Sequence, residues 1–128
     1  MKALVCGDRN WTNRQYLYRI LDALHAHRKF SILIEGEAKG ADRMARDWAI
    51  KNKVSVRKFP AMWMVYGKGA GVIRNQQMLD EGKPDIIIAF HNDISASTGT
   101  RDMVRRARGK LIHIQLYKEG DLVTLNGI

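Results

Sequence analysis

The sequence predicts an α/β fold, with a single Rossmann-like, doubly wound domain over residues 1–128 and a mostly parallel five-stranded sheet. Two observations predict it. Short apolar segments alternate with segments of helical periodicity along the whole chain, which is the pattern of repeated strand–helix units. The most apolar segment, residues 85–90, has no polar face after Asp85, as expected of a strand that helices cover on both sides of a parallel sheet.

Each predicted element has its own local signal. The first strand is an apolar run that ends at Gly7, and Thr12 or Asn13 can cap the helix that follows. A strand that alternates apolar and polar residues stops at Pro60, which suits a sheet edge. The five predicted strands are residues 2–6, 31–34, 54–59, 85–90 and 110–116, and residues 121–125 have the pattern of a further short strand. The predicted helices are residues 13–27, 41–51, 72–80 and 100–108.

One stretch of the chain, residues 61–71, does not fit this alternation of strands and helices. Residues 61–71 are rich in glycine and aromatic residues and have no regular pattern. In the helix that follows them, Ile73, Met78 and Leu79 are predicted to face inward, and Trp48 at helical spacing is predicted to lie in the core.

Composition narrows the classes of partner. Twenty-two Lys and Arg against thirteen Asp and Glu give a net charge of +9, which attracts nucleotides, nucleic acid or acidic protein surfaces without choosing among them. The apolar runs are too short to cross a membrane, and no secretory signal is recognised. With a single cysteine, Cys6, predicted to be buried and inert, we expect a cytoplasmic protein. The four histidines have no metal-ligand spacing, so neither a metal nor a cofactor is expected.

Three loops that follow predicted strands combine glycine with polar or basic residues: residues 7–12, 36–42 and 95–100. In an open parallel sheet such loops meet at one edge, where helix N-termini point their N–H groups at a ligand. Arg9 and Lys39 can hold a phosphate, while the third loop offers hydroxyls and helix N-terminal amides. Each loop also has a structural interpretation, as a tight turn or as a helix cap by Ser97 or Thr98.

These loops and the helix opened by Arg74 define the predicted ligand site. Trp11, Trp63 and Tyr66 could stack on a base, and His91 follows the central strand. The predicted ligand-binding residues are Gly7, Arg9, Trp11, Gly36, Lys39, Gly40, Asp42, Arg74, Asn75, Thr98, Gly99 and Thr100.

Over residues 2–116 the sequence resembles the bacterial and phage proteins of the YspA, cpYpsA-related family in the SLOG superfamily. The residues that carry the resemblance are GDRNWT (7–12), GEAKGAD (36–42), FPAMW (59–63), GKGAG (67–71), RNQQML (74–79), PD (84–85) and GTRDMV (99–104). Family members usually have Gly where Glu37 stands and Asp where Met62 stands. The resemblance implies a SLOG fold that binds a nucleotide or a nucleotide-derived molecule of the ADP-ribose or NAD-derived class, and it makes a homo-oligomer an open expectation.

Two alternatives follow from the wider superfamily. Lonely Guy phosphoribohydrolases share the frame formed by Arg74 with Met78 and Gly99 with Thr100, but Met103 stands where their catalytic glutamate would be. If this chain is such an N-glycosidic hydrolase, its carboxylate is predicted to be Asp102 or Glu37. The second alternative is nucleic-acid binding in the manner of DprA, motivated by the net charge and the basic helix 100–108. The small-molecule ligand is favoured over both.

Overall fold

The computed structural model describes residues 1–123 and 125. The strands are β1 (Lys2–Gly7), β2 (Ile32–Glu35), β3 (Ser55–Lys58), β4 (Ile86–Phe90), β5 (His113–Lys118) and β6 (Asp121–Val123). The helices are α1 (Arg14–His27), α2 (Ala41–Lys51), α3 (Trp63–Tyr66), α4 (Ala70–Gly82) and α5 (Gly99–Gly109), with short 3-10 turns η1 (Gly67–Gly69) and η2 (Ile94–Ala96). None of the helices in the described residues is long and apolar enough to span a bilayer.

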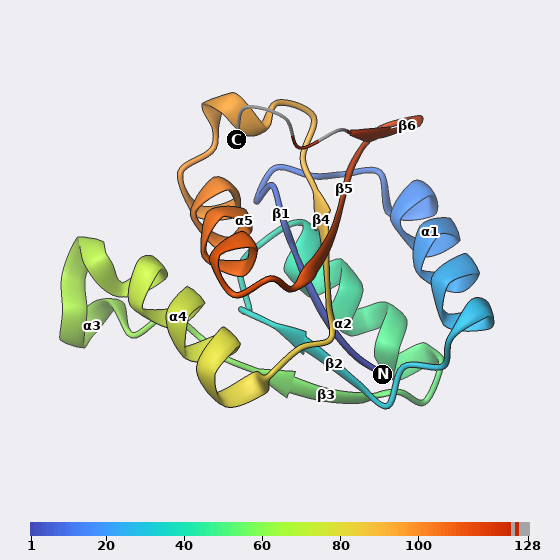
Figure 1. The fold of residues 1–128 in the computed structure, drawn as a ribbon, viewed down its shortest axis with the longest axis horizontal. Helices are drawn as coiled ribbons and strands as arrows, with labels where there is room; N and C mark the ends of the chain where they lie inside the picture. The colour runs from blue at the N-terminus through green and yellow to red at the C-terminus, as the bar shows by residue number, and fades with distance from the viewer. Residues whose placement is uncertain (124, 126–128) are drawn as a thin grey trace.

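The strands form one six-stranded sheet in the order β3-β2-β1-β4-β5-β6 (Figure 1). The first five are parallel, and β6 pairs antiparallel with β5. This is the strand order typical of Rossmann sheets, so the predicted α/β, doubly wound fold is confirmed. The predicted count of five strands was one too low, because Gly120 turns the chain with a φ of 84° and lets residues 121–123 pair back onto β5. Residue 124, in the predicted last segment, lies outside the described residues.

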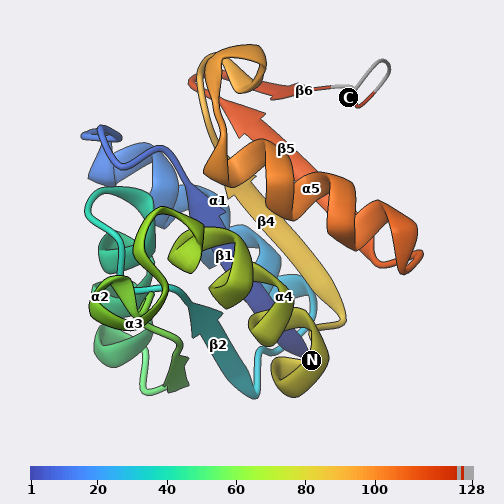
Figure 2. The ribbon, with the colours of Figure 1, turned by 90° about the vertical axis from the view of Figure 1, so that its left-hand side faces the viewer.

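Helices cover both faces of the sheet (Figure 2). On one face Leu17 and Leu21 of α1 pack with Trp48 of α2 against the sheet, which confirms Trp48 as a core residue. On the other face Met78 of α4 and Met103 of α5 pack against the opposite side chains of the same strands. The sheet therefore separates two apolar layers, and every residue of β4 is buried between them.

The order of the sheet reverses between β1 and β4. Chain connections run outward from β1 to β2 and β3 on one side, and from β4 to β5 on the other. The two strands end together, since Gly7 of β1 is in register with Phe90 of β4. Ligands of open α/β sheets bind beyond the carboxyl ends of the strands at such a reversal.

Three predictions, about a segment without regular structure, the direction of one side chain and the start of one strand, differ from the structure. Residues 61–71, predicted to be irregular, contain α3 and η1. Ile73 is 43% exposed and does not face inward as predicted, whereas Met78 and Leu79 do. The strand predicted to begin at residue 110 begins at His113, because Lys110 still bonds to the last carbonyls of α5 and Leu111 takes a φ of 60° to leave the helix.

Candidate ligand site at the carboxyl edge of the sheet

The loops after β1 and β2 are locked together by two glycines. A Cβ at Gly7 would stand 2.3 Å from the carbonyl oxygen of Phe90, and one at Gly40 would stand 2.4 Å from that of Asp8. Gly40 also has a φ of 77°, which L side chains rarely adopt. The N–H of Ala41 donates to Asp8 O at 3.2 Å, so the amino end of α2 is fixed against the first loop.

A buried carboxylate shapes the second loop. Asp42 Oδ2 accepts hydrogen bonds from the N–H groups of Gly36 (3.2 Å) and Ala38 (3.3 Å), so it arches the loop over the first turn of α2. Burial raises the pKa of Asp42 to about 6, while Arg74 and these two N–H donors oppose the rise. Asp42 was predicted to contact the ligand, but its Oδ2 is already bonded to two N–H groups of the loop itself.

Arg74 lies where the sequence placed it, beside the same loop. Its Nη1 donates to the carbonyl oxygen of Gly36, and its Nε donates to Asn75 Oδ1 at 3.1 Å. A Cβ at Gly36 would stand 2.3 Å from Arg74 Nη1, so a larger residue there would push the guanidinium out of its present position. Arg74 therefore ties α4 to the loop after β2.

The two predicted phosphate-holding cations face solvent. Arg9 follows β1 and Lys39 follows β2, and both are exposed. In the part of the chain that the structure describes, neither side chain has an ion pair or a hydrogen bond to another side chain. Two uncompensated positive charges thus stand on loops that touch each other through Gly40.

The third loop ends in a capped helix. Ser97 Oγ accepts hydrogen bonds from the N–H groups of Thr100 (3.0 Å) and Arg101 (3.4 Å), so Ser97 caps α5 by its side chain, one of the two predicted possibilities. Thr98 and Gly99 are exposed at the start of the helix, while Thr100 is buried. The exposed start of α5 therefore presents backbone at the edge where β4 ends.

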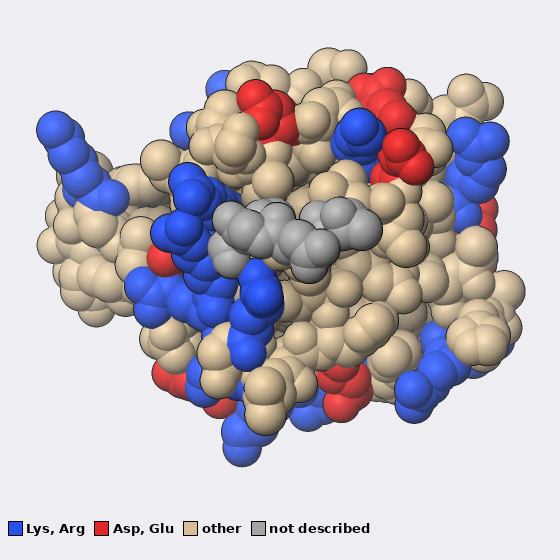
Figure 3. Space-filling model, turned by 45° about the horizontal axis from the view of Figure 1, so that its top comes forward, with Lys and Arg blue, Asp and Glu red and all other residues tan. Residues whose placement is uncertain are grey.

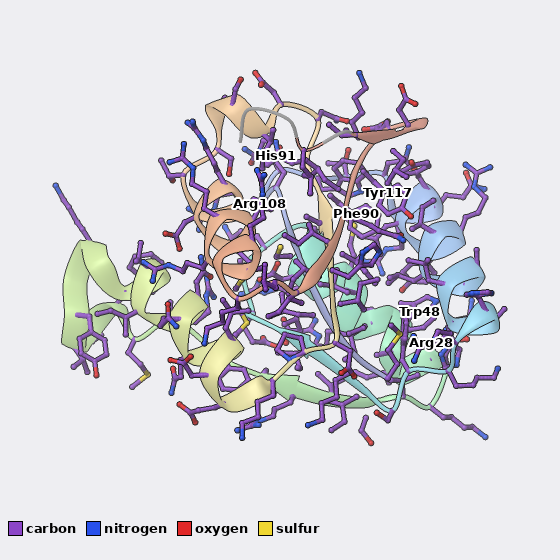
Figure 4. All side chains as sticks on the ribbon, viewed as in Figure 1. Arg28, Trp48, Phe90, His91, Arg108 and Tyr117 are labelled. Atoms are coloured by element: carbon purple, nitrogen blue, oxygen red, sulfur yellow. The ribbon has the colours of Figure 1, made fainter. Side chains whose placement is uncertain are left out.

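The aromatic residues are arranged differently from the prediction. Trp11 is 3% exposed, its ring lies 5.6 Å from that of Phe90, and its indole N–H donates to Asn13 O, so it belongs to the core and is not open to stack on a base. Trp63 and Tyr66 are half exposed on α3. His91 lies at the end of β4 near Tyr117, and its Nε2 is 3.8 Å from Asp8 Oδ2 (Figure 4).

Both predicted catalytic carboxylates are engaged with the protein itself. Asp102 accepts hydrogen bonds from Asn75 Nδ2 at 3.0 Å and from Arg106 Nε at 2.9 Å, which joins α4 to α5. Glu37 Oε2 is 3.2 Å from Arg46 Nη1. In residues 1–123 and 125 no group of three or more His, Cys, Asp or Glu is arranged to hold a metal ion.

Glu35, at the carboxyl end of β2, was missed by sequence reasoning. It is fully buried, and its Oε1 accepts a hydrogen bond from the N–H of Glu37 at 2.7 Å. Burial, and after it the contact with the Glu37 carboxylate, raise the pKa of Glu35 to about 8, so at neutral pH Glu35 keeps a proton that it can donate to Glu37. The same contact lowers the pKa of Glu37. In the sequence Glu35 stands at the end of an apolar strand and before a glycine, and this position gives no signal that its side chain is buried.

Two shallow hollows of the described surface lie away from this edge. One is lined by Arg14, Tyr18 and Asp22 on α1, and the other lies beside the start of β5. Both are open to solvent, and neither contains the close-packed glycines or the unpaired cations of the three loops. We therefore place the candidate site at the carboxyl edge.

The sequence profile of the family described as YAcAr, YspA, cpYpsA-related SLOG, matches residues 1–66, which include β1, β2 and both glycine loops. The chain belongs to this family. It is also similar to the Gene 61 protein of Mycobacterium phage D29, with 34% identity over 113 residues that cover 84% of this chain and 88% of the phage protein. Both matches agree with the resemblance noted from the motifs.

A solved structure shares the fold. It is the UDP-GlcNAc 2-epimerase from Neisseria meningitidis bound to UDP-GlcNAc, with a TM-score of 0.52 and 14% sequence identity. The match covers 91% of this SLOG chain and 32% of the epimerase, so this chain spans about a third of the length of that enzyme. At this identity the likeness concerns the fold alone, which is Rossmann-like.

The structure explains one departure of this SLOG chain from its family. Glu37 has a φ of 60°, in the left-handed region that favours glycine, and glycine is the usual family residue there. Its side chain contacts Glu35 and pairs with Arg46, two interactions that a glycine at this position would lack. At the second departure, Met62 stands half exposed in front of α3.

Proposed function

We propose that this protein binds the phosphate group of a nucleotide-derived small molecule, of the ADP-ribose or NAD-derived class, between the loops that follow β1, β2 and β4. The observation that carries the proposal is the pair of unpartnered cations, Arg9 and Lys39, on two loops locked together by Gly40. Positive charge without a protein partner, next to helix amino ends, favours an anionic ligand.

The proposed ligand-binding residues divide into two roles. Arg9, Lys39 and the backbone of Thr98 and Gly99 contact the phosphate, because they are exposed. Gly7, Gly36, Gly40, Asp42, Arg74, Asn75 and Thr100 hold the loops in position through their close packing or their hydrogen bonds. Trp11 supports the first loop from within the core.

The experiment is native mass spectrometry of the purified protein, followed by denaturing release and identification of any bound nucleotide. We expect a mass above that of the 14.6 kDa chain, from a co-purified or added ADP-ribose-like molecule. A protein that remains free of ligand at millimolar ADP-ribose, NAD and nucleoside monophosphates would contradict the proposal.

A hydrolase of the Lonely Guy kind receives less support from the geometry. Asp102 is bonded to Asn75 and Arg106, and Glu37 is bonded to Arg46, so neither carboxylate is free to stabilise a developing ribosyl cation without breaking an ion pair. We therefore propose binding without a hydrolytic step.

Nucleic-acid binding is the second candidate, and one observation favours it. Basic side chains gather over α5 (Figure 3), where Arg101 and Arg105 have no ion-pair partner in the described residues. Since phosphate contacts release counterions, this candidate predicts that affinity for DNA falls steeply between about 50 and 200 mM salt. Gel-shift titrations at several salt concentrations test it, and absence of a shift at low salt removes it.

A further inference from the structure

The exposed apolar surface of this protein is concentrated in one segment, residues 62–73, which we call the arm. Seven of the ten large hydrophobic residues that are exposed in the described chain belong to it. They are Met62 (52%), Trp63 (54%), Met64 (99%), Val65 (65%), Tyr66 (52%), Val72 (42%) and Ile73 (43%). Scattered exposed apolar residues are ordinary on a monomer, but a contiguous group of this size marks an interaction surface.

The first part of the arm, residues 62–69, stands away from the two layers of helices, and residues 70–73 join it to α4 as the first turn of that helix. Its helix α3 has no buried residue and lies at one end of the molecule, beyond α4 (Figures 1 and 2). Gly67, with a φ of 60°, turns the chain between α3 and η1. The Trp63 ring lies over Gly71, where an added Cβ would be 3.6 Å away, so the arm packs mainly on itself. The rest of its apolar surface faces outward.

Area and charge together indicate the occupant. At these exposed fractions the seven residues present roughly 800 Å² of accessible surface, about what each partner contributes to a standard-sized protein interface. Lys68 is the only charged residue in the arm, although the whole chain carries a net charge of +9. A contact through the arm brings only one lysine of each copy near the interface, so two positively charged chains can approach there with little repulsion.

We propose that the arm is a homodimer interface, in which two copies of this chain bury residues 62–73 against each other across a two-fold axis. Such an interface uses the same patch on both copies and needs no complementary charge, which matches an apolar segment with one lysine. The arm ends at Ile73, next to Arg74, so the interface lies beside the residue that holds Gly36 in the candidate site.

The test compares three proteins by sedimentation equilibrium. Wild type is expected at twice the 14.6 kDa mass of the chain at micromolar concentration. The double variant Met64→Glu, Val65→Glu is expected to be monomeric, with the dissociation constant of the dimer raised at least about 30-fold, because it places charge at the centre of the buried patch. The control is Leu111→Glu, which adds the same kind of charge at an equally exposed apolar residue outside the arm, and it is expected to remain dimeric.

Tryptophan fluorescence gives a second readout. Trp11 and Trp48 are buried within each chain, whereas Trp63 is half exposed, so only Trp63 changes environment on association. We expect the emission of wild type to shift to the red on dilution, and that of the double variant to be independent of concentration. A wild-type protein that is monomeric at about 100 μM, or a double variant that still dimerises, would overturn the proposal.

Discussion

At the scale of single residues, the shared proton between Glu35 and Glu37 is the most unusual feature of the site. Glu35 Oε2 and Glu37 Oε1 are both buried, and among the described residues neither has a hydrogen-bond partner other than the contact between the two carboxyl groups. Two carboxylates this close cannot both be charged without strong repulsion. The raised pKa of Glu35 therefore makes the stability of the fold depend on pH.

The sign of the pH dependence follows from the raised pKa of Glu35. Its pKa rises from 4.5 to about 8 on folding, so the stability it contributes is fully present below pH 4.5 and is lost as the pH rises through about 8. In the variant Glu35→Gln, the side-chain amide can still donate an N–H to the Glu37 carboxylate and accept from the backbone N–H of Glu37, but it cannot ionise. We expect this variant to be more stable than wild type at pH 9 by at least about 1 kcal/mol, and similar at pH 4, where Glu35 is protonated in both the folded and the unfolded protein.

Urea unfolding of both proteins at pH 4 and 9 measures this difference. Other titrating groups, such as Asp42 and His25, are present in both proteins, so they cancel in the comparison. Equal pH dependence of wild type and Glu35→Gln would show that Glu35 does not carry the proton.

Gly40 provides the second prediction at this scale. Gly40→Ala requires a side chain at a φ of 77° and places a Cβ 2.4 Å from Asp8 O, so we expect a loss of about 2–4 kcal/mol in the free energy of unfolding. Gly109→Ala is the matched control, because nothing lies within 4 Å of its added Cβ and its φ is not positive. Thermal unfolding of the two variants should therefore differ clearly, and equal melting temperatures would refute the close packing of the two loops.

At the scale of elements, α4 and α5 are joined by polar side chains rather than by apolar packing alone. Asn75 Nδ2 donates to Gly99 O at 3.1 Å and to Asp102 Oδ2, while Arg106 Nη1 donates to Gln76 Oε1 at 2.7 Å. Asn75 is buried, so its amide cannot exchange these partners for water. The network fixes the amino end of α5 relative to α4.

Removal of the Asn75 amide should loosen that end of α5. Asn75→Ala is expected to lower the free energy of unfolding by about 1–3 kcal/mol, because Gly99 O and Asp102 lose a buried donor. Gln77→Ala, at an exposed position of the same helix, is expected to change stability by less than about 0.5 kcal/mol. Urea unfolding compares them, and a neutral Asn75→Ala would mean that the network does not position α5.

The elements that could be predicted from the sequence are those whose signals are local. The apolar run of β4, the helical period of α1 and its cap at Asn13, whose side chain accepts from the N–H of Tyr16, all act within a few residues. The start of β5 could not be predicted. The sequence from Lys110 onward suits a strand, but the N–H of Lys110 still donates to the carbonyl oxygens of Arg106 and Ala107 in α5. The burial of Trp11 likewise depends on Phe90, far along the chain.

At the scale of the whole molecule, the Rossmann order of the sheet decides where the candidate site lies. It brings together loops from residues 7, 36 and 97 that no local pattern connects, and sequence reasoning anticipated this edge because strand alternation implied parallel strands. The division of roles at that edge could not be predicted. Arg74 and Asp42 were expected to meet the ligand, yet they bond to the loop itself, and Glu35 was not considered.

The most direct test of the account is calorimetric titration of ADP-ribose into wild type, the Arg9→Ala, Lys39→Ala double variant, and Arg28→Ala. Arg28 is an exposed arginine after α1, near the opposite edge of the sheet from His91 (Figure 4), so it controls for loss of net charge. We predict that the double variant weakens binding at least about tenfold, while Arg28→Ala changes it less than about twofold. Equal affinity in all three proteins, or no binding by wild type, would contradict a phosphate site at the loops after β1 and β2.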